Sequence, residues 1–392
     1  MPLAEFQENL RLGESMPLAL MAPAEMCESQ EPPPRLRRGG RENTGNCKWT
    51  NTGNCRLIAE AEAISRQPRN VVPHLPRCLR PCAFALLFVV VPLHGAFAHC
   101  FVGARFFPAT LLIDDPCVAD EMSLPTVSWS RTGDVPPATE WDVSVELSKR
   151  ITEDFGVSIG EDWSQIRQPG SPTLAGFGDL ETTFQYQLLK DGAHETAMLL
   201  GLIVDWGGTG ATGSGIGTSY SLLTPTYYFG QGFGGLLDSV GWARPFAVTG
   251  QVGYQIPTTS YDMSQGIAIP QELVYGGSLQ YSMPYLKSEV KDFQLPDVFN
   301  HLIWIVEAQF ATPVADNLGN SYLTTGTINP GVIWVGSYFQ VGLEAMVPVN
   351  AASGSGVGVL GQVHLYLDDM FPKTFGQPLI GGTSTPPTKL TF

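Results

Sequence analysis

Residues 271–285 read QELVYGGSLQYSMPY, and apolar and polar side chains alternate along them. An alternation with a period of two predicts a β-strand that has one apolar and one polar face. The apolar face carries Leu273, Tyr275, Leu279, Tyr281, Met283 and Tyr285, and the polar face carries Ser278, Gln280 and Ser282. Strands in soluble proteins usually have about five or six residues, whereas a tilted strand that crosses a bilayer needs about 9 to 11. The length of this stretch therefore indicates a transmembrane strand.

The same alternation recurs along most of the chain after residue 140. It is found in residues 141–148, 180–188, 246–256, 302–310, 339–347 and 357–365. The KDGA sequence that starts at Lys190 is typical of a tight hairpin, and the glycine-rich stretch that starts at Trp206 is typical of a long extracellular loop. We therefore expect an all-β protein, a transmembrane antiparallel β-barrel over residues 140–372, with about 12 strands within a range of roughly 10 to 14.

A secreted, soluble β-sandwich alternates in the same way and is the alternative fold. Its strands are usually shorter, and the side that faces water usually carries more charge. The polar positions of this chain are mostly Gln, Ser, Thr and Gly, which favours the lining of a pore. Recovery of the protein in the soluble periplasm without detergent would favour the sandwich instead.

The polar faces of the expected strands define the candidate site, which is the lining of the barrel lumen. Its expected members are Asp142, Glu146, Glu181, Gln185, Gln251, Gln280, Glu307, Gln340 and Glu344. Carboxylates that line a pore disfavour anions and admit cations or neutral solutes. If the carboxylates instead lie at the barrel ends in bulk water, they select nothing.

The segment around residues 82–98 has the order of parts of a secretory signal peptide. Arg77 and Arg80 precede an apolar run that ends near Leu93, and the run is followed by Ala96-Phe97-Ala98. A basic region, an apolar region and a small-x-small site are the parts of such a signal. We expect residues 71–98 to be the signal, cleaved after Ala98, and residues 1–70 to be an untranslated or disordered extension.

Residues 99–139 form an N-terminal segment without an alternation long enough for the wall. Its Cys100 and Cys117 form a plausible disulfide in an oxidising compartment. The segment lies either in the periplasm or inside the lumen as a plug: its apolar run at 109–113 favours burial, whereas its acidic cluster would be repelled by an acidic lumen. Residues 373–392 form a C-terminal tail, because Pro386 and Pro387 do not suit a paired strand.

The net charge and the absence of known motifs narrow the range of functions that we expect. The net charge is −15, and most acidic residues lie after residue 98, so nucleic acid is excluded as a partner. The histidines after residue 98 lack the spacing of metal ligands, and the GTGATG at Gly208 does not open a helix as a dinucleotide fingerprint must. We therefore expect no metal, no cofactor and no enzyme activity.

The sequence GFGDLETTFQYQLL at residues 176–189 resembles a motif of the outer-membrane barrels named for the meta pathway of phenol degradation, which are related to FadL-type channels. The resemblance implies an outer-membrane location and passive uptake of small neutral or hydrophobic compounds, often aromatic. The partners expected are outer-membrane lipid, the outer-membrane assembly machinery and a small-molecule solute. The alternative is a non-conducting barrel with a structural or enzymatic role.

Overall fold

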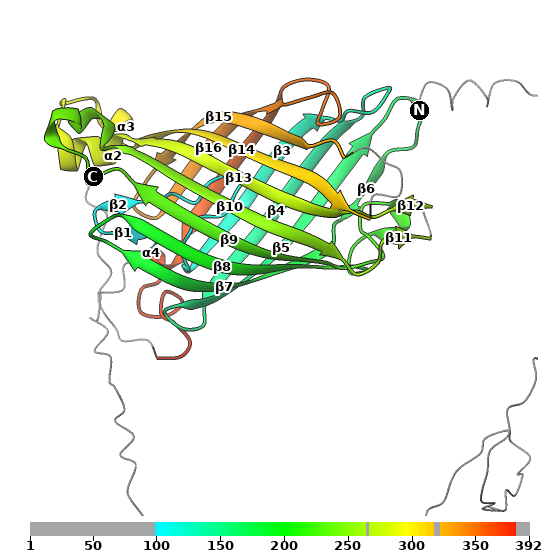
Figure 1. Ribbon diagram of the computed structural model, residues 1–392, viewed down its shortest axis with the longest axis horizontal. Coiled ribbons are helices and arrows are strands. Elements are labelled where there is room, and N and C mark those ends of the chain that lie inside the picture. The colour runs from blue at the N-terminus through cyan, green and yellow to red at the C-terminus, as the bar shows by residue number, and fades with distance from the viewer. Residues whose placement is uncertain (1–98, 264–265, 317–321, 382–392) are drawn as a thin grey trace, which may run out of the picture. The chain divides into compact units, whose positions relative to one another are not determined.

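The wall of the protein is a closed ring of strands in a computed structural model that describes residues 99–263, 266–316 and 322–381 (Figure 1). Within these residues, twelve antiparallel strands form the ring, since β4 pairs with both β3 and β5 and β3 also pairs with β17. The expected extension, signal peptide and last part of the tail lie outside the described residues. The ring confirms the all-β antiparallel barrel and the estimate of about 12 strands.

The wall strands are long, at 9 to 14 residues each. They are β3 (Glu121–Arg131), β4 (Thr139–Arg150), β5 (Phe155–Arg167), β7 (Leu180–Asp191), β8 (Thr196–Trp206), β9 (Leu222–Gly232), β10 (Phe246–Pro257), β13 (Gln271–Ser282), β14 (Leu302–Ala315), β15 (Thr325–Val335), β16 (Phe339–Pro348) and β17 (Gly358–Tyr366). Among the described residues, no helix is long and apolar enough to cross a membrane.

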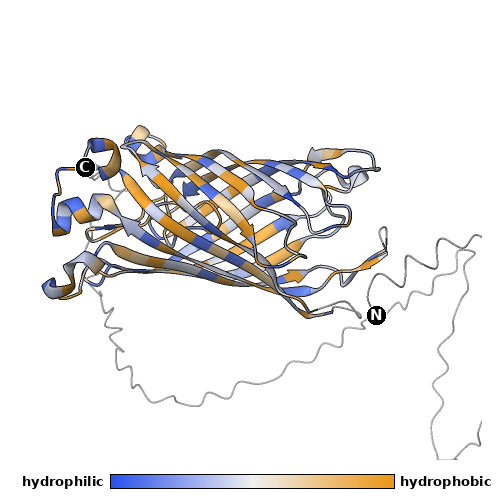
Figure 2. Cartoon of the chain, turned by 90° about the horizontal axis from the view of Figure 1, so that it is seen from above, coloured by the Kyte–Doolittle hydropathy of each residue, from blue (hydrophilic) through white to orange (hydrophobic). Residues whose placement is uncertain are grey.

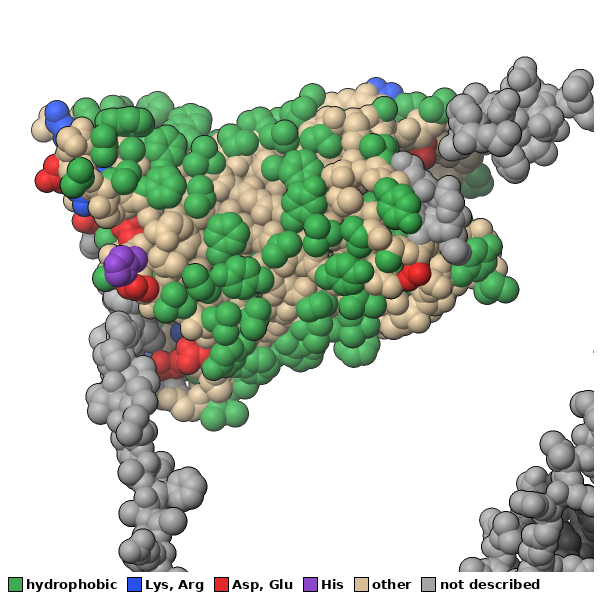
Figure 3. Space-filling view, viewed as in Figure 1, with side chains coloured by type: hydrophobic (Ala, Val, Ile, Leu, Met, Phe, Trp, Pro, Cys, Tyr) green, Lys and Arg blue, Asp and Glu red, His purple; other side chains and the backbone are tan. Residues whose placement is uncertain are grey.

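Neighbouring residues of one strand face opposite sides of the wall, as the sequence alternation predicts. On β13, the side chain of Leu279 is 47% exposed on the outside, whereas that of Gln280 is 2% exposed on the inside. On β16, Val341 and Leu343 are exposed, and Gln340 and Glu344 are buried. Apolar and polar residues accordingly alternate along the strands in Figure 2, and apolar side chains spread over the outer surface in Figure 3. The outer face is therefore the kind of surface that lipid requires.

The expectation that the wall begins at residue 140 is wrong. Strand β3 pairs with β17 on one side and with β4 on the other, so it completes the ring. Its alternation is hidden in the sequence because the register shifts between Ser123 and Thr126, where Pro125 has no backbone N–H to donate to a neighbouring strand. Among the described residues, 99–120 precede the wall, and they are called the inner segment below.

The two ends of the barrel differ in their connections. The turn end has the short turns 151–154, 192–195 and 336–338 as well as the two longer connections 233–245 and 283–301, and the loop end has connections such as 132–138, 207–221 and 258–270. The turn end also carries β1 (Phe101–Val102), β2 (Arg105–Phe106), η2 (Asp238–Ala243), α2 (Met283–Tyr285), η3 (Leu286–Val290), α3 (Asp297–Asn300) and α4 (Leu367–Met370) (Figure 1). The loop end carries β6 (Leu174–Phe177), η1 (Thr212–Ser214), β11 (Tyr261–Asp262) and β12 (Ile267–Ala268).

Candidate functional site: the barrel lumen

The inner segment lies within the barrel, against the side chains that face inward. Phe107 and Arg105 are fully buried, and Leu111 and Ile113 are also buried. Leu111 belongs to one buried apolar cluster with the inward-facing Ile305 and Leu360. The apolar run of the segment, which the sequence shows without a strand pattern, is therefore removed from water by the interior of the barrel.

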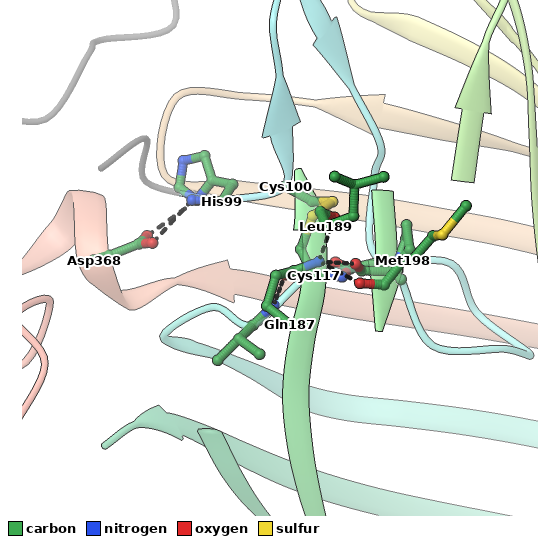
Figure 4. The surroundings of a disulfide bond; sticks show 10 residues. His99, Cys100, Cys117, Gln187, Leu189, Met198 and Asp368 are labelled. Carbon is green, nitrogen blue, oxygen red and sulfur yellow. Dashed lines mark hydrogen bonds and ion pairs between the residues drawn. A yellow bond between two sulfur atoms is a disulfide. The ribbon is translucent and has the colours of Figure 1, made fainter. Parts of the chain in front are cut away.

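A disulfide closes the inner segment on itself near the turn end. Cys100 and Cys117 are bonded, with their Cα atoms 5.3 Å apart. Gln187 of β7 holds the same region, because its Oε1 accepts a hydrogen bond from the Val118 N–H and its Nε2 donates to the Pro116 carbonyl, at 3.1 and 3.0 Å (Figure 4). The segment is thus fixed to the wall by side chain to backbone bonds as well as by apolar packing.

Glu307 of β14 holds the middle of the inner segment. Its Oε2 accepts hydrogen bonds from the backbone N–H groups of Leu111 and Leu112, at 2.9 and 3.0 Å. Gln340 of β16 donates to the carbonyl of Ala109. A Cβ atom at Gly342 of the same strand would lie 2.4 Å from Leu111 Cδ1, so a larger residue here would force the Leu111 side chain to shift.

The inner segment begins and ends at the turn end of the barrel. Buried ion pairs connect it to the wall near both of its ends. Arg105 donates to Glu195 at 3.1 Å and lies over the Tyr285 ring. Asp120 accepts from Arg150 at 2.9 Å. Breaking a buried pair by removing one partner is costly, because it leaves a charge without compensation. These pairs therefore specify one position for the segment.

His99 ties the start of the inner segment to α4. Its ring nitrogens lie 3.0 Å from Asp368 Oδ1 and 2.5 Å from Asp369 Oδ2, and its backbone N–H donates to Asp368. Burial opposes protonation of the imidazole, but the two carboxylates outweigh burial and raise the pKa of His99 to about 9. The imidazole is therefore a cation at neutral pH and holds the segment through an ion pair.

Next to the inner segment, the lumen contains a cavity of about 260 Å³. Residues 110–114 of the segment form one side, and strands β3, β4, β5, β7, β8 and β17 form the others. The acidic side chains that line it are Asp114, Glu146, Asp162, Asp179, Glu181 and Asp205. No Lys or Arg is found among the described residues that line it. The cavity therefore has a strongly negative lining.

Strand register explains why three of these carboxylates face one space. Glu146 pairs across with Gly160, Gly160 with Glu181, and Glu181 with Asp205, so the four residues form one row over β4, β5, β7 and β8. Gly160 has no side chain, which leaves a gap between Glu146 and Glu181. Neighbouring strands are about 4.8 Å apart, so the row spreads its charges along the wall rather than focusing them on one point.

A smaller pocket of about 50 Å³ adjoins the cavity and shares Asp114 and Glu146 with it. His364 of β17 also lines this pocket, and its Nε2 lies 3.0 Å from Glu121 Oε2. Burial, together with the nearby Glu146 carboxylate, raises the pKa of Asp114 to about 7. The charge of this part of the lumen therefore changes near neutral pH.

The candidate residues from the sequence fall into separate groups. Glu146 and Glu181 line the cavity, and Gln185 lines the smaller pocket. Glu307 and Gln340 form hydrogen bonds with the backbone of the inner segment, which covers them. Glu344 accepts a hydrogen bond from Asn329 and is buried, so it does not face open lumen.

The remaining candidate residues do not line the cavity. Gln280 is buried and donates to Ser278. Asp142 accepts from Ser128 and Ser164, and Gln251 is half-buried on β10. A sequence pattern shows which way these side chains face, but it does not show where the inner segment covers them.

Sequence reasoning missed Asp114, Asp179, Asp205 and His364 as lining residues. Asp179 belongs to the GFGDL motif, and its carboxylate accepts hydrogen bonds from the backbone N–H groups of Gly210 and Thr218. It therefore fixes the loop between β8 and β9 while it lines the cavity. Asp205 stands out as a lone charge in the apolar run of β8, which is the signal that could have identified it.

Comparisons with known proteins give solved structures of low identity and no protein family. No protein-family model and no curated protein matches the chain. A NanC porin structure is 8% identical over 62% of this chain and 98% of that chain, with a TM-score of 0.37. An outer membrane channel from Pseudomonas putida F1 is 10% identical over 67% and 99%, with a TM-score of 0.43. The translocator domain of the autotransporter NalP from Neisseria meningitidis is 11% identical over 63% and 87%, with a TM-score of 0.35. The resemblance to the phenol meta-pathway barrels is not confirmed.

Proposed function

We propose that the protein is an outer-membrane channel for the passive uptake of small neutral or hydrophobic compounds. The observation that carries the proposal is a closed barrel with an apolar outer face and a polar lumen that contains a cavity. A closed ring leaves no strand edge unpaired, and that is what a β-structure needs in a bilayer. Outer-membrane lipid surrounds the wall, and the outer-membrane assembly machinery inserts it.

The three short turns of the wall all lie at the turn end, and this supports an orientation. Barrels of this kind have short periplasmic turns and longer extracellular loops. We infer that the turn end faces the periplasm and that the cavity is reached from the loop end. Cleavage after Ala98 would leave His99 as the first residue, next to Asp368 at the periplasmic end.

The acidic lining supports exclusion of anions. A solute that enters meets Asp205 and Asp179 on one side and Glu146 and Asp114 on another, and no lining cation offsets them in the described part of the chain. Anions are repelled in such a space, whereas uncharged compounds are not. Leu111 and Leu112 add apolar surface to the same cavity, which supports hydrophobic compounds as part of the solute range.

A non-conducting barrel is the second candidate, and the inner segment favours it. The segment occupies the lumen and is fixed by Glu307, Arg105 and Asp120. If the inner segment leaves no path for solutes through the lumen, the barrel has a structural role.

Swelling of liposomes that contain the refolded chain decides between these functions. We expect swelling in arabinose, which is neutral, and much slower swelling in gluconate, which is an anion of similar size. The Glu146→Gln/Glu181→Gln variant should narrow the difference between the two solutes, and Glu272→Gln, a lumen carboxylate outside the cavity, should not. If the liposomes swell neither in arabinose nor in gluconate, the non-conducting barrel is supported.

A further inference from the structure

The two longer connections at the turn end expose large apolar side chains. In the connection 233–245, the side chains of Leu237 and Trp242 are 77% and 67% exposed. In the connection 283–301, those of Phe293, Val298 and Phe299 are exposed as well. These five residues are called the corner patch below. In the described short turns 151–154 and 192–195 of the same end, no large apolar side chain is exposed. Exposed apolar patches mark surfaces that contact a protein or a membrane.

The two connections pack against each other, so the corner patch belongs to one folded surface. Helix η2 of the first connection contacts η3 of the second. A Cβ atom built at Gly241 would lie 3.6 Å from Val290 Cγ1. Tyr285 and Leu286 are buried beneath the second connection. The helices gather at one corner of the barrel in Figure 1, and apolar side chains cover that corner in Figure 3.

The corner patch is continuous with the outer face of the wall. The Trp242 ring meets the Phe246 ring edge to face, with centroids 6.4 Å apart, and the Phe246 ring meets that of Tyr281 at 4.7 Å. Tyr281 also donates a hydrogen bond to the Trp242 carbonyl, at 3.4 Å. Tyr281 shares the outward face of β13 with Leu279 and pairs across with Trp304 of β14. An occupant of the patch therefore adjoins the lipid that surrounds the wall.

The charges of the two connections nearly balance, so charge does not select the occupant. The basic residues are Arg244, Lys287 and Lys291, and the acidic residues are Asp238, Glu289, Asp292 and Asp297. Lys291 Nζ lies 5.1 Å from the centre of the Phe293 ring, and Arg244 pairs with Asp238 at 3.3 Å. Aromatic rings beside charged groups are typical of surfaces that lie at the boundary between lipid and water.

We propose that the corner patch lies in the headgroup region of the membrane and binds phospholipid beside β10, β13 and β14. Strands alone place aromatic residues at this depth in a barrel of the usual kind. Here two connections outside the wall extend the lipid contact beyond the strand ends, on one side of the barrel. Apolar side chains of short helices gain free energy when they enter the boundary between headgroups and acyl chains. The inference rests on the membrane location of the wall and not on conduction.

Photochemical cross-linking of the full chain in isolated outer membranes identifies the occupant. The photoreactive residue p-benzoylphenylalanine replaces Leu237 in one variant and Val298 in another. Folding is checked by heat-dependent migration in a gel, and Phe299 serves as the third position if either variant does not fold. After irradiation, mass spectrometry counts adducts of phosphatidylethanolamine. We expect at least tenfold more adduct at both positions than at Ala193, which is exposed in the short turn 192–195.

The same label at Leu279, on the outer face of β13, gives the yield of a residue in lipid. Cross-links from Leu237 and Val298 to a second copy of the chain, or to another protein, would overturn the proposal. Adducts at Leu279 without adducts at these two positions would also overturn it, as would equal yields at Ala193. Absence of adducts at Leu279 as well would contradict the membrane location on which the inference rests. Conductance, which tests the proposed channel, is measured separately.

Discussion

The Glu307 carboxylate lies 2.9 Å from the backbone nitrogen of Leu111 and accepts its hydrogen bond. The two residues are 196 positions apart in the chain. One is in the wall, and the other is in the segment that precedes the wall. Their contact therefore holds the middle of the inner segment in the lumen, next to the other bonds that fix the segment nearer the turn end.

Replacing Glu307 with Ala should loosen the inner segment. The N–H groups of Leu111 and Leu112 would lose their acceptor, and a buried donor without a partner costs about 1 to 3 kcal/mol. We expect trypsin to cut after Arg105, which is buried in the native chain, and mass spectrometry to detect the fragment after reduction of the Cys100–Cys117 disulfide. Gln309→Ala, on the same inward face of β14, is the matched control. Equal resistance of both variants to trypsin would show that Glu307 does not hold the segment.

Removing the disulfide should act on the inner segment alone. Cys100 and Cys117 are separated by 17 positions, and closing a loop of about this size contributes roughly 3 kcal/mol in the chain-entropy account. In Cys100→Ser/Cys117→Ser, cleavage after Arg105 should become faster, while the heat-dependent migration that reports an intact wall stays the same. Loss of that migration would instead mean that the wall depends on the disulfide.

The contact between His99 and Asp368 should weaken at high pH. A pKa of about 9, above the ordinary value of 6.5, means that the ion pair contributes its full stability below about pH 6.5 and loses it as the pH rises through 9. Hydrogen exchange of residues 99–107, corrected for intrinsic rates, should show less protection at pH 10 than at pH 7. Asp368→Asn should lower protection already at pH 7. Protection that does not change up to pH 10 would contradict the ion pair.

Arginine on the outer face should prevent assembly, whereas arginine on the inner face should not. Leu279→Arg and Val341→Arg place a charge on exposed, lipid-facing positions, at a cost of about 2 to 4 kcal/mol each in the middle of the membrane. Gln251→Arg, which is half-buried on the inward face of β10, is the control. Folding into lipid vesicles is measured by heat-dependent migration. Equal yields for the inward and outward variants would refute the assignment of the faces.

The wall of the barrel could be predicted from the sequence because the two faces of a strand are determined by residues that are neighbours in the chain. Leu279 and Gln280 are neighbours, and their contrast alone shows that a strand has two different faces. Strand β3 was missed because the bulge near Pro125 interrupts the period. Strand β8 gives a weak signal because its run of apolar residues, from Ala197 to Val204, is nearly continuous on both faces.

The site could be predicted only in part, because it depends on contacts between distant parts of the chain. Glu146 and Glu307 both have the polar-face signature of a lining residue. The first lines the cavity, and the second is covered by Leu111 and Leu112. The periodicity of the sequence does not show which carboxylate the inner segment covers. The path of this segment is determined by tertiary packing and by ion pairs such as that of Arg105 with Glu195.

The central claim is that this barrel is a channel whose lumen is narrowed by residues 99–120. The most direct test is the single-channel conductance of the chain that begins at His99, measured beside a variant that begins at Glu121 and keeps all twelve wall strands. We expect small currents from the first and clearly larger currents from the second, with both folded in the same lipid. Equal conductance of two folded proteins, or no conductance in either, would contradict the claim.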